Sequence, residues 1–114
     1  MKMRIHRGAM VVLAVAALVG FPLFSGLALA VDKHATEALE HAKEAVAHGK
    51  QGHADVLVQH AEEALKHAGA AAKNPHVDEG IKHLKEAVAH GKAGHADVAT
   101  EHADAAVTHL SEVK

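Results

Sequence analysis

Cysteine, tryptophan and tyrosine are absent from this chain of 114 residues. Without cysteine the chain can form no disulfide, no thiolate metal site, no CxxCH haem attachment and no lipoprotein anchor. Both phenylalanines and all three methionines lie within the first 30 residues. The rest of the chain must therefore build its core from aliphatic residues, most of them alanine, and can offer a metal ion only nitrogen and oxygen ligands.

The first 30 residues have the organisation of a secretory signal peptide. Three basic residues precede an apolar run, which ends in the small residues of an Ala-Leu-Ala site at Ala30. We predict cleavage after Ala30 and export of residues 31–114 to the periplasm, without a membrane contact after cleavage. The alternative is an uncleaved membrane anchor, which the shortness of the run and the presence of Pro22 disfavour.

The charge and motifs of residues 31–114 exclude two broad classes of function. Nine basic against fourteen acidic residues give this segment a net charge of −5 with neutral histidine, whereas nucleic-acid binding requires a basic face. The sequence contains no nucleophile constellation, glycine-rich phosphate loop or HExxH motif. We therefore expect neither nucleic-acid binding nor catalysis.

Residues 31–114 are an internal duplication. A shift of 42 residues aligns 31–72 with 73–114 at about 20 identical positions. The stretch KEAVAHGKQGHADV, which starts at Lys43, returns at Lys85 as KEAVAHGKAGHADV. Twelve of the 13 histidines lie in the duplicated region. They are His34, His41, His48, His53, His60 and His67 in the first copy, and His76, His83, His90, His95, His102 and His109 in the second.

Each copy has the pattern of two amphipathic helices, because apolar residues recur three or four positions apart. In the first copy these residues are Ala35, Ala38, Leu39, Ala42, Ala45 and Val46, followed by Ala54, Leu57, Val58, Ala61, Ala64, Leu65 and Ala68. Four helices with short connections predict an all-α fold. We expect a monomeric, antiparallel up-down-up-down four-helix bundle made of two duplicated helical hairpins, over about 31–72 and 73–114.

Polar and glycine residues indicate where these helices begin and end. Asp32 is the expected N-cap of the first helix, and Asn74 followed by Pro75 is the expected N-cap and first residue of the third. Gly49 and Gly52 are expected to serve as the C-cap and connector of the first turn.

The histidines follow one edge of each apolar stripe when residues are placed at about 100° intervals around a helix. In an antiparallel hairpin, residues whose numbers share a constant sum lie at the same height, which predicts three histidine pairs per hairpin. The pairs are His34/His67, His41/His60 and His48/His53, then His76/His109, His83/His102 and His90/His95. The two pairs that flank the turns are the most local, and we expect them to be the best preorganised.

This arrangement favours metal sites built from two helices. Histidines seven apart on one helix are separated by about 10 Å of rise, too far to share one ion. Glutamates also lie three or four residues from histidines, where they can act as ligands or orient the rings. We predict all twelve histidines as metal ligands. The glutamates predicted as ligands or orienting partners are Glu37, Glu44, Glu63, Glu79 and Glu86.

Imidazole and carboxylate ligands suit Cu(II), Ni(II), Zn(II) and Co(II), and Cu(II) is the tightest of these. Sites of two histidines and one glutamate predict open coordination and reversible binding of several ions per chain. One alternative is that the histidines are a solvated helix edge multiplied by duplication, although histidine is only a middling helix former. Another is a pH-responsive structural or interaction bundle, whose histidine columns repel when protonated.

The heptad-spaced histidines and the segments EAVAHGKxGHADV and IKHLKEAVAHGK resemble the bacterial small metal-binding protein family. The resemblance covers essentially all of residues 31–114. It implies a periplasmic, histidine-rich four-helix bundle that binds several divalent metals, copper prominently. It also implies a role in metal sequestration, buffering or tolerance, with the twelve histidines at the matching positions.

Overall fold

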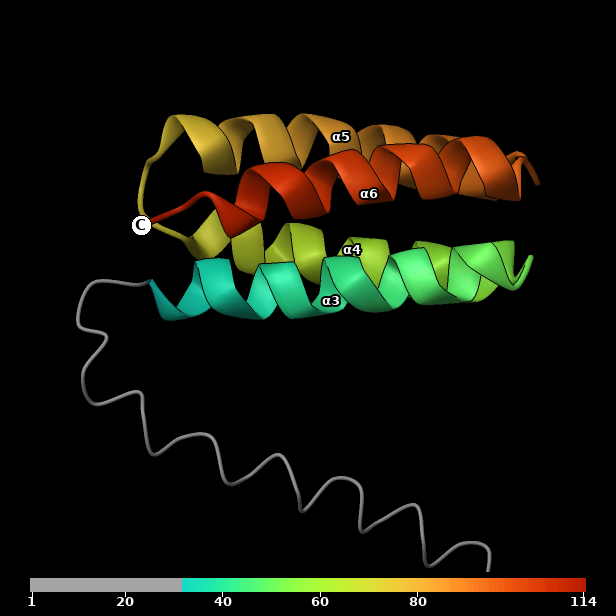
Figure 1. Ribbon diagram of the computed structural model, residues 1–114, viewed down its shortest axis with the longest axis horizontal. Coiled ribbons are helices and arrows are strands. Elements are labelled where there is room, and N and C mark those ends of the chain that lie inside the picture. Colours follow the sequence, from blue (N-terminus) through green and yellow to red (C-terminus); the bar gives the residue numbers. More distant parts are fainter. Residues whose placement is uncertain (1–31) are drawn as a thin grey trace, which may run out of the picture. The chain divides into compact units, whose positions relative to one another are not determined.

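The computed structural model describes residues 32–114, in which four helices follow one another along the chain (Figure 1). They are α3 (Lys33–Lys50), α4 (Ala54–Ala70), α5 (Pro75–Lys92) and α6 (Ala96–Ser111). No strand occurs in this part of the chain, so the all-α prediction is confirmed for it. The predicted signal peptide, residues 1–30, lies outside the described residues. None of the four helices has both the length and the apolar character needed to cross a membrane.

The helix starts are confirmed at both predicted N-caps. Asp32 Oδ1 accepts hydrogen bonds from the backbone N–H groups of His34 (2.8 Å) and Ala35 (3.4 Å). Asn74 Oδ1 accepts one from the N–H of His76 (2.7 Å), and α5 then begins at Pro75. Each side chain satisfies backbone donors that have no partner within the first turn of a helix.

The turns after α3 and α5 share one backbone motif. The Gly52 N–H donates to the Gly49 carbonyl (2.9 Å) and the His53 N–H donates to the His48 carbonyl (3.0 Å), which is the Schellman arrangement. Gly52 has a φ of +83° and its counterpart Gly94 has +84°, a conformation that favours glycine. This motif brings the side chains of its first and sixth residues together, which explains the five-residue histidine step at the turn.

Gly49 does not end α3, so its predicted role as a C-cap was wrong. The helix continues to Lys50, and Gln51 is the C-cap. Gly49 is buried inside the bundle, where a Cβ would collide with Thr100 Oγ1 and lie 2.6 Å from Leu57 Cδ1. Glycine at this position permits the close approach of α3 to its neighbours rather than terminating the helix.

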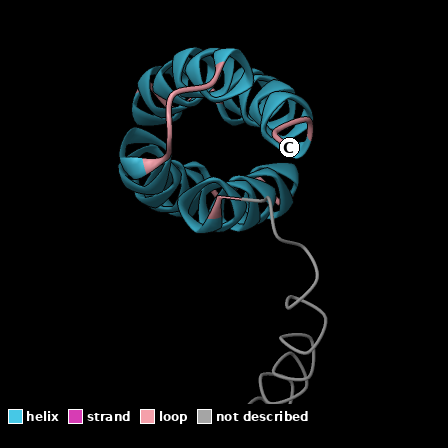
Figure 2. Ribbon diagram, turned by 90° about the vertical axis from the view of Figure 1, so that its left-hand side faces the viewer, coloured by secondary structure: helices cyan, strands magenta, loops and turns pink. Residues whose placement is uncertain are grey.

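Small aliphatic side chains fill the space between the helices. α3 and α5 each pack chiefly against α4 and α6, and the four helices surround a common centre when viewed along their length (Figure 2). The buried apolar residues are Ala35, Ala38, Ala42, Ala45, Val46, Leu57, Val58, Ala61, Ala64, Ala68, Val77, Leu84, Ala87, Ala99, Ala103, Ala106 and Leu110. No polar or charged residue among residues 32–114 is buried. The predicted apolar stripes are therefore core, with Leu39, Ala54 and Leu65 only partly buried.

The helices approach one another closely at the turn end of the bundle, around Leu57. A Cβ on Gly91 would lie 2.5 Å from Val58 Cγ2 and 3.5 Å from Leu57 Cδ2. Gly49 and Gly91 occupy equivalent positions in the two copies, and a Cβ on either one would meet Leu57. This close packing holds in place the helix ends that carry the turn-flanking histidines.

Candidate metal centres

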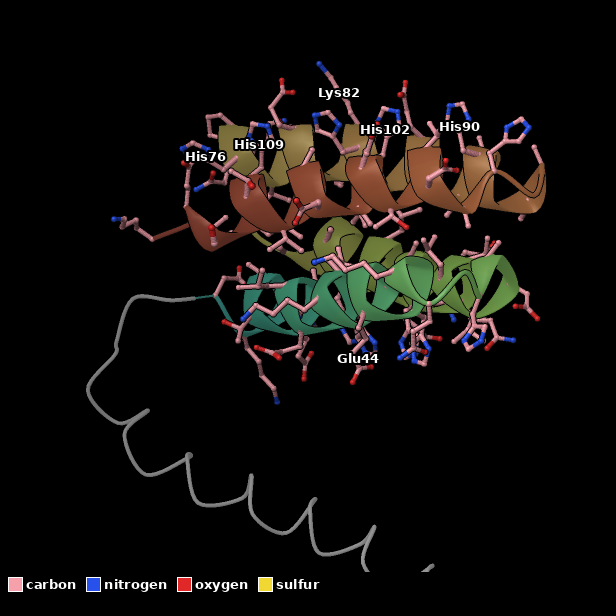
Figure 3. The ribbon with its side chains drawn as sticks, turned by 45° about the vertical axis from the view of Figure 1, so that its right-hand side comes forward. Glu44, His76, Lys82, His90, His102 and His109 are labelled. Atoms are coloured by element: carbon pink, nitrogen blue, oxygen red, sulfur yellow. The ribbon has the colours of Figure 1, made fainter. Side chains whose placement is uncertain are left out.

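The twelve histidines form two columns, one carried by α3, α4 and their turn, the other by α5, α6 and their turn. Figure 3 shows four histidines of the second column, His76, His90, His102 and His109, pointing outward on one side of the bundle, whereas Glu44, which contacts the first column, points outward on the opposite side. The first column contains His34, His41, His48, His53, His60 and His67. The second column contains His76, His83, His90, His95, His102 and His109. His34, His53 and His95 are exposed, and the other nine are half-buried.

The predicted cross-helix pairs are confirmed as neighbouring rings. In the first column the ring centroids of the three pairs lie 6.1, 5.9 and 6.2 Å apart, for His34/His67, His41/His60 and His48/His53. In the second column they lie 6.3, 5.7 and 6.1 Å apart, for His76/His109, His83/His102 and His90/His95. The register set by the turn therefore extends along the full length of each column.

Diagonal pairs, which the sequence analysis did not consider, bring the rings still closer. The centroids of His41 and His67 are 5.3 Å apart and their planes are inclined by only 7°. The rings of His48 and His60 are also 5.3 Å apart, at 4°. The second column repeats both contacts at 5.4 Å, in His83/His109 and His90/His102. Each column is thus a continuous zigzag of six imidazoles rather than three separate pairs.

Carboxylates approach the first column mainly across the helix interface. Glu37 Oε1 on α3 lies 3.1 Å from His67 Nδ1 on α4, but 3.9 Å from His34 Nδ1 on its own helix. Glu44 Oε1 lies 3.1 Å from His60 Nδ1, again on α4. The sequence spacing had suggested contacts between glutamates and histidines of the same helix. The shortest contacts in this column instead join a glutamate on α3 to a histidine on α4.

Several of these side chains converge closely enough to bind a common ion. In five groups, two histidines and one glutamate each bring a ligand atom within 4.8 Å of the others. The groups of the first column are His34/Glu37/His67, His41/Glu63/His67 and His41/Glu44/His60. Those of the second column are His76/His109/Glu112 and Glu79/His83/His109. Glu86 joins no such group, although its Oε1 lies 3.3 Å from His102 Nε2. Ligation by the predicted histidines and glutamates stays a prediction.

Glu112 was missed by the sequence analysis. It is the C-cap residue of α6, and its Oε1 lies 3.1 Å from His76 Nδ1. It follows His109 by three residues, the same spacing that joins His34 to Glu37. That spacing was the signal in the sequence that could have identified it.

The turn-flanking pairs differ from the other cross-helix pairs in their surroundings. Their ring planes are inclined by 34° for His48/His53 and 37° for His90/His95, close to the 27–31° of the other four pairs. None of the three-ligand groups found in residues 32–114 includes any of these four histidines. The expectation that they are the best preorganised pairs is not supported, because the carboxylates lie beside other histidines.

Four ring nitrogen atoms are buried without a hydrogen bond, although the histidines that carry them are only half-buried, which indicates that the columns are suited to a further ligand. They are the Nδ1 atoms of His41, His48, His60 and His109. His60 Nδ1 has no hydrogen bond even though Glu44 Oε1 lies 3.1 Å away. A buried polar atom without a partner costs about 1–3 kcal/mol. Metal ions bound at these nitrogen atoms would remove that cost, so the donor set fits cations that accept imidazole ligands.

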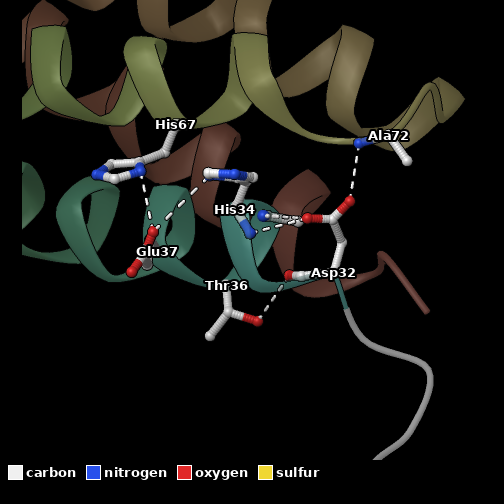
Figure 4. A network of polar contacts seen from close by, with 7 residues as sticks. Asp32, His34, Thr36, Glu37, His67 and Ala72 are labelled. Carbon is white, nitrogen blue, oxygen red and sulfur yellow. Dashed lines mark hydrogen bonds and ion pairs between the residues drawn. The ribbon is translucent and has the colours of Figure 1, made fainter.

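Asp32 links the start of α3 to the chain just after the end of α4, beside the first column (Figure 4). Its Oδ2 accepts a hydrogen bond from the N–H of Ala72 (2.8 Å), just after α4, while its Oδ1 caps α3. The bond from Ala72 holds the pKa of the Asp32 carboxyl below its ordinary value, and partial desolvation acts in the opposite sense. This link fixes the helix ends that carry His34 and His67.

Comparison with known proteins identifies the family. A family model described as small metal-binding protein matches residues 8–113. The chain therefore belongs to the small metal-binding protein family, as the histidine pattern suggested. No curated protein matches the sequence.

Proposed function

We propose that this chain binds several divalent transition-metal ions reversibly along its two histidine columns, with Cu(II) preferred over Ni(II), Zn(II) and Co(II). The role that follows is metal sequestration, buffering or tolerance in the periplasm. The observation that carries the proposal is the unbroken series of imidazole rings, 5.3–6.3 Å between neighbouring centroids, in each column. Histidines scattered over the helix surfaces would not form such an unbroken series.

The choice of metal follows from the ligand atoms. Residues 31–114 contain no cysteine or methionine, so thiolate- and thioether-requiring Cu(I) transport is disfavoured. Imidazole nitrogen with carboxylate oxygen binds Cu(II) most tightly among the divalent first-row ions. Two histidines and one glutamate leave positions open for water, which favours exchange over permanent retention.

The proposal includes the topology and processing expected from the sequence. An antiparallel up-down-up-down order is supported by the ring pairs, in which rising numbers on α3 meet falling numbers on α4. The mature protein is proposed to be a non-enzymatic monomer with no nucleic-acid partner and no membrane contact. Its export rests on the signal-peptide pattern that ends at Ala30.

Calorimetric titration of the purified protein at pH 7.5, with each of the four ions in turn, tests the proposal. We expect saturable binding of several ions, tightest for Cu(II), which is lost near pH 5 because protons compete for the imidazoles. Absence of binding at pH 7.5 would contradict it. That result would leave the pH-responsive bundle as the better explanation for the histidine columns.

A further inference from the structure

We infer that each interior histidine of a column belongs to two overlapping metal positions, so that a column can fill in two mutually exclusive ways. In one way, ions occupy the cross-helix pairs, such as His41/His60. In the other, ions occupy the diagonal pairs, such as His41/His67. This inference rests on the proposed function and adds to it the rule by which the sites are occupied.

The ring distances show the overlap directly. His41 lies 5.9 Å from His60 and 5.3 Å from His67, while His60 lies 5.3 Å from His48. Ring order along the first column is His34, His67, His41, His60, His48, His53. Ring order along the second is His76, His109, His83, His102, His90, His95. Only the two end rings of each column have a single neighbour.

Helix geometry explains why the rings of the diagonal pairs lie close together. Histidines seven apart are separated by about 10 Å along a helix, so a ring placed midway between them lies about 5 Å from each. Side chains on a helix lean toward its N-terminus. In the antiparallel order proposed above, His41 therefore leans toward His67 and His67 leans toward His41. The same lean brings His48 and His60 together, and these are the diagonals observed.

The carboxylates support both sets of positions. His41 joins Glu44 and His60 in a cross-helix group, but joins Glu63 and His67 in a diagonal group. In the second column His109 is shared in the same way, between a group with His76 and Glu112 and a group with Glu79 and His83. A neutral imidazole can donate to a metal through only one of its nitrogen atoms, because the other carries a hydrogen. A ring that binds one ion is therefore not available to the next position, and adjacent positions exclude one another.

Both kinds of pair have separations that one ion can bridge. A metal–nitrogen bond of about 2 Å places the ring centroid about 3 Å from the ion, so two rings on one ion lie about 5–6 Å apart as the angle between them opens. The diagonal pairs, at 5.3–5.4 Å, and the cross-helix pairs, at 5.7–6.3 Å, both lie in or near this range. The cross-helix register offers three positions per column, and the diagonal register offers two.

Two matched variants distinguish overlapping positions from fixed pairs. The outer variant carries His34→Ala, His53→Ala, His76→Ala and His95→Ala. The inner variant carries His48→Ala, His67→Ala, His90→Ala and His109→Ala. Both destroy the same four cross-helix pairs and leave His41/His60 and His83/His102 intact, but only the outer variant keeps all four diagonals. The His53 and His95 side chains make no capping hydrogen bond that alanine would remove.

The readout is the number of Cu(II) ions bound per chain at saturation, measured by equilibrium dialysis with metal analysis, with helicity checked by circular dichroism. We expect four ions on the outer variant and two on the inner variant. Equal numbers on the two variants would overturn the inference. An unmodified protein that binds no Cu(II) would instead overturn the proposed function, so the two failures are distinguishable.

A second pair of variants keeps the test decisive if fourfold substitution unfolds the bundle. His34→Ala with His53→Ala, and His48→Ala with His67→Ala, alter only the first column. We expect the first of these double variants to bind one Cu(II) ion more than the second. Equal binding by these two folded proteins would likewise rule out overlapping positions.

Discussion

The two halves of the bundle carry the same histidines but differ in some of their carboxylates. All six histidines of the first half recur in the second after a shift of 42 residues. Glu63 of the first half is replaced by Ala105 in the second, and Ala70 is replaced by Glu112. The first column therefore has Glu63 beside its diagonal pair His41/His67, and the second has Glu112 beside its end pair His76/His109. The two columns therefore share the same ring positions and differ in the carboxylates beside the rings.

The cores of the two halves differ in a complementary way. Leu57 corresponds to Ala99, whereas Ala42 corresponds to Leu84 and Ala68 to Leu110. All six side chains are buried. At these three positions a large residue in one copy corresponds to alanine in the other, so the two halves contribute different side-chain volumes to the core. The two similar histidine columns are therefore carried by a core that differs between the two halves.

The largest expected effect comes from removing one of these large residues. Leu57→Ala and Leu84→Ala should each lower the free energy of unfolding by about 2–5 kcal/mol, because both side chains are fully buried. Leu65→Ala, at a partly buried position, should cost less. Urea unfolding followed by circular dichroism measures all three. A cost for Leu65→Ala equal to that of Leu57→Ala would contradict the packing described.

The helix-interior glycines should give the next largest effect. Gly49→Ala and Gly91→Ala place a Cβ against Leu57, Thr100 or Val58, so we expect a loss of about 1–3 kcal/mol. Gly69→Ala is the matched control in α4, because a Cβ there meets nothing within 4 Å. That substitution should stabilise the helix by about 0.5–1 kcal/mol. Thermal unfolding of the three variants checks the difference in sign.

These glycines show where sequence reasoning about the fold fails. The caps at Asp32 and Asn74 were predicted because a cap depends on residues next to it in the chain. Gly49 was misassigned because a glycine near a helix end resembles a C-cap, while its contact with Thr100 arises from packing of distant segments. Periodicity identifies which face of a helix is buried, but not how closely another helix approaches it.

Substitutions at Glu63 and Ala105 should change how strongly the equivalent positions of the two columns bind Cu(II). Glu63→Gln should weaken Cu(II) binding at the His41/His67 position by about tenfold, because a carboxylate within reach of both rings is replaced by a neutral amide. Ala105→Glu should strengthen the equivalent position of the second column. Glu40→Gln is the control, since Glu40 pairs with Lys43 and joins no candidate group. Calorimetric titration compares the three, and equal weakening by Glu40→Gln would exclude a specific role for Glu63.

The site itself was only partly predictable from the sequence. The cross-helix pairing of histidines follows from the turn length and heptad spacing, and both can be counted. The diagonal contacts depend on the direction in which side chains lean, and the contact of Glu37 with His67 depends on how α3 is rotated against α4. These features involve relative helix orientation, which residue spacing within one helix does not determine.

The smallest effect concerns Asp32, whose counterpart in the second half is Asn74. Because folding lowers the pKa of Asp32, its ionised form stabilises the protein above the ordinary value of 3.8. This stabilisation is lost as the pH falls through the lowered, folded-state pKa. Asp32→Asn should therefore be modestly less stable than the unmodified protein at pH 7, with a difference that narrows below pH 3.8. Urea unfolding at several pH values checks this, and a difference independent of pH would contradict it.

The most direct test of metal binding by the histidine columns is anomalous diffraction at the copper edge from crystals of the protein loaded with Cu(II). We predict anomalous peaks between neighbouring imidazoles of both columns, including positions in contact with His41 and His83. Peaks confined to surface carboxylates away from the columns, or the absence of ordered copper at saturating Cu(II), would contradict the account.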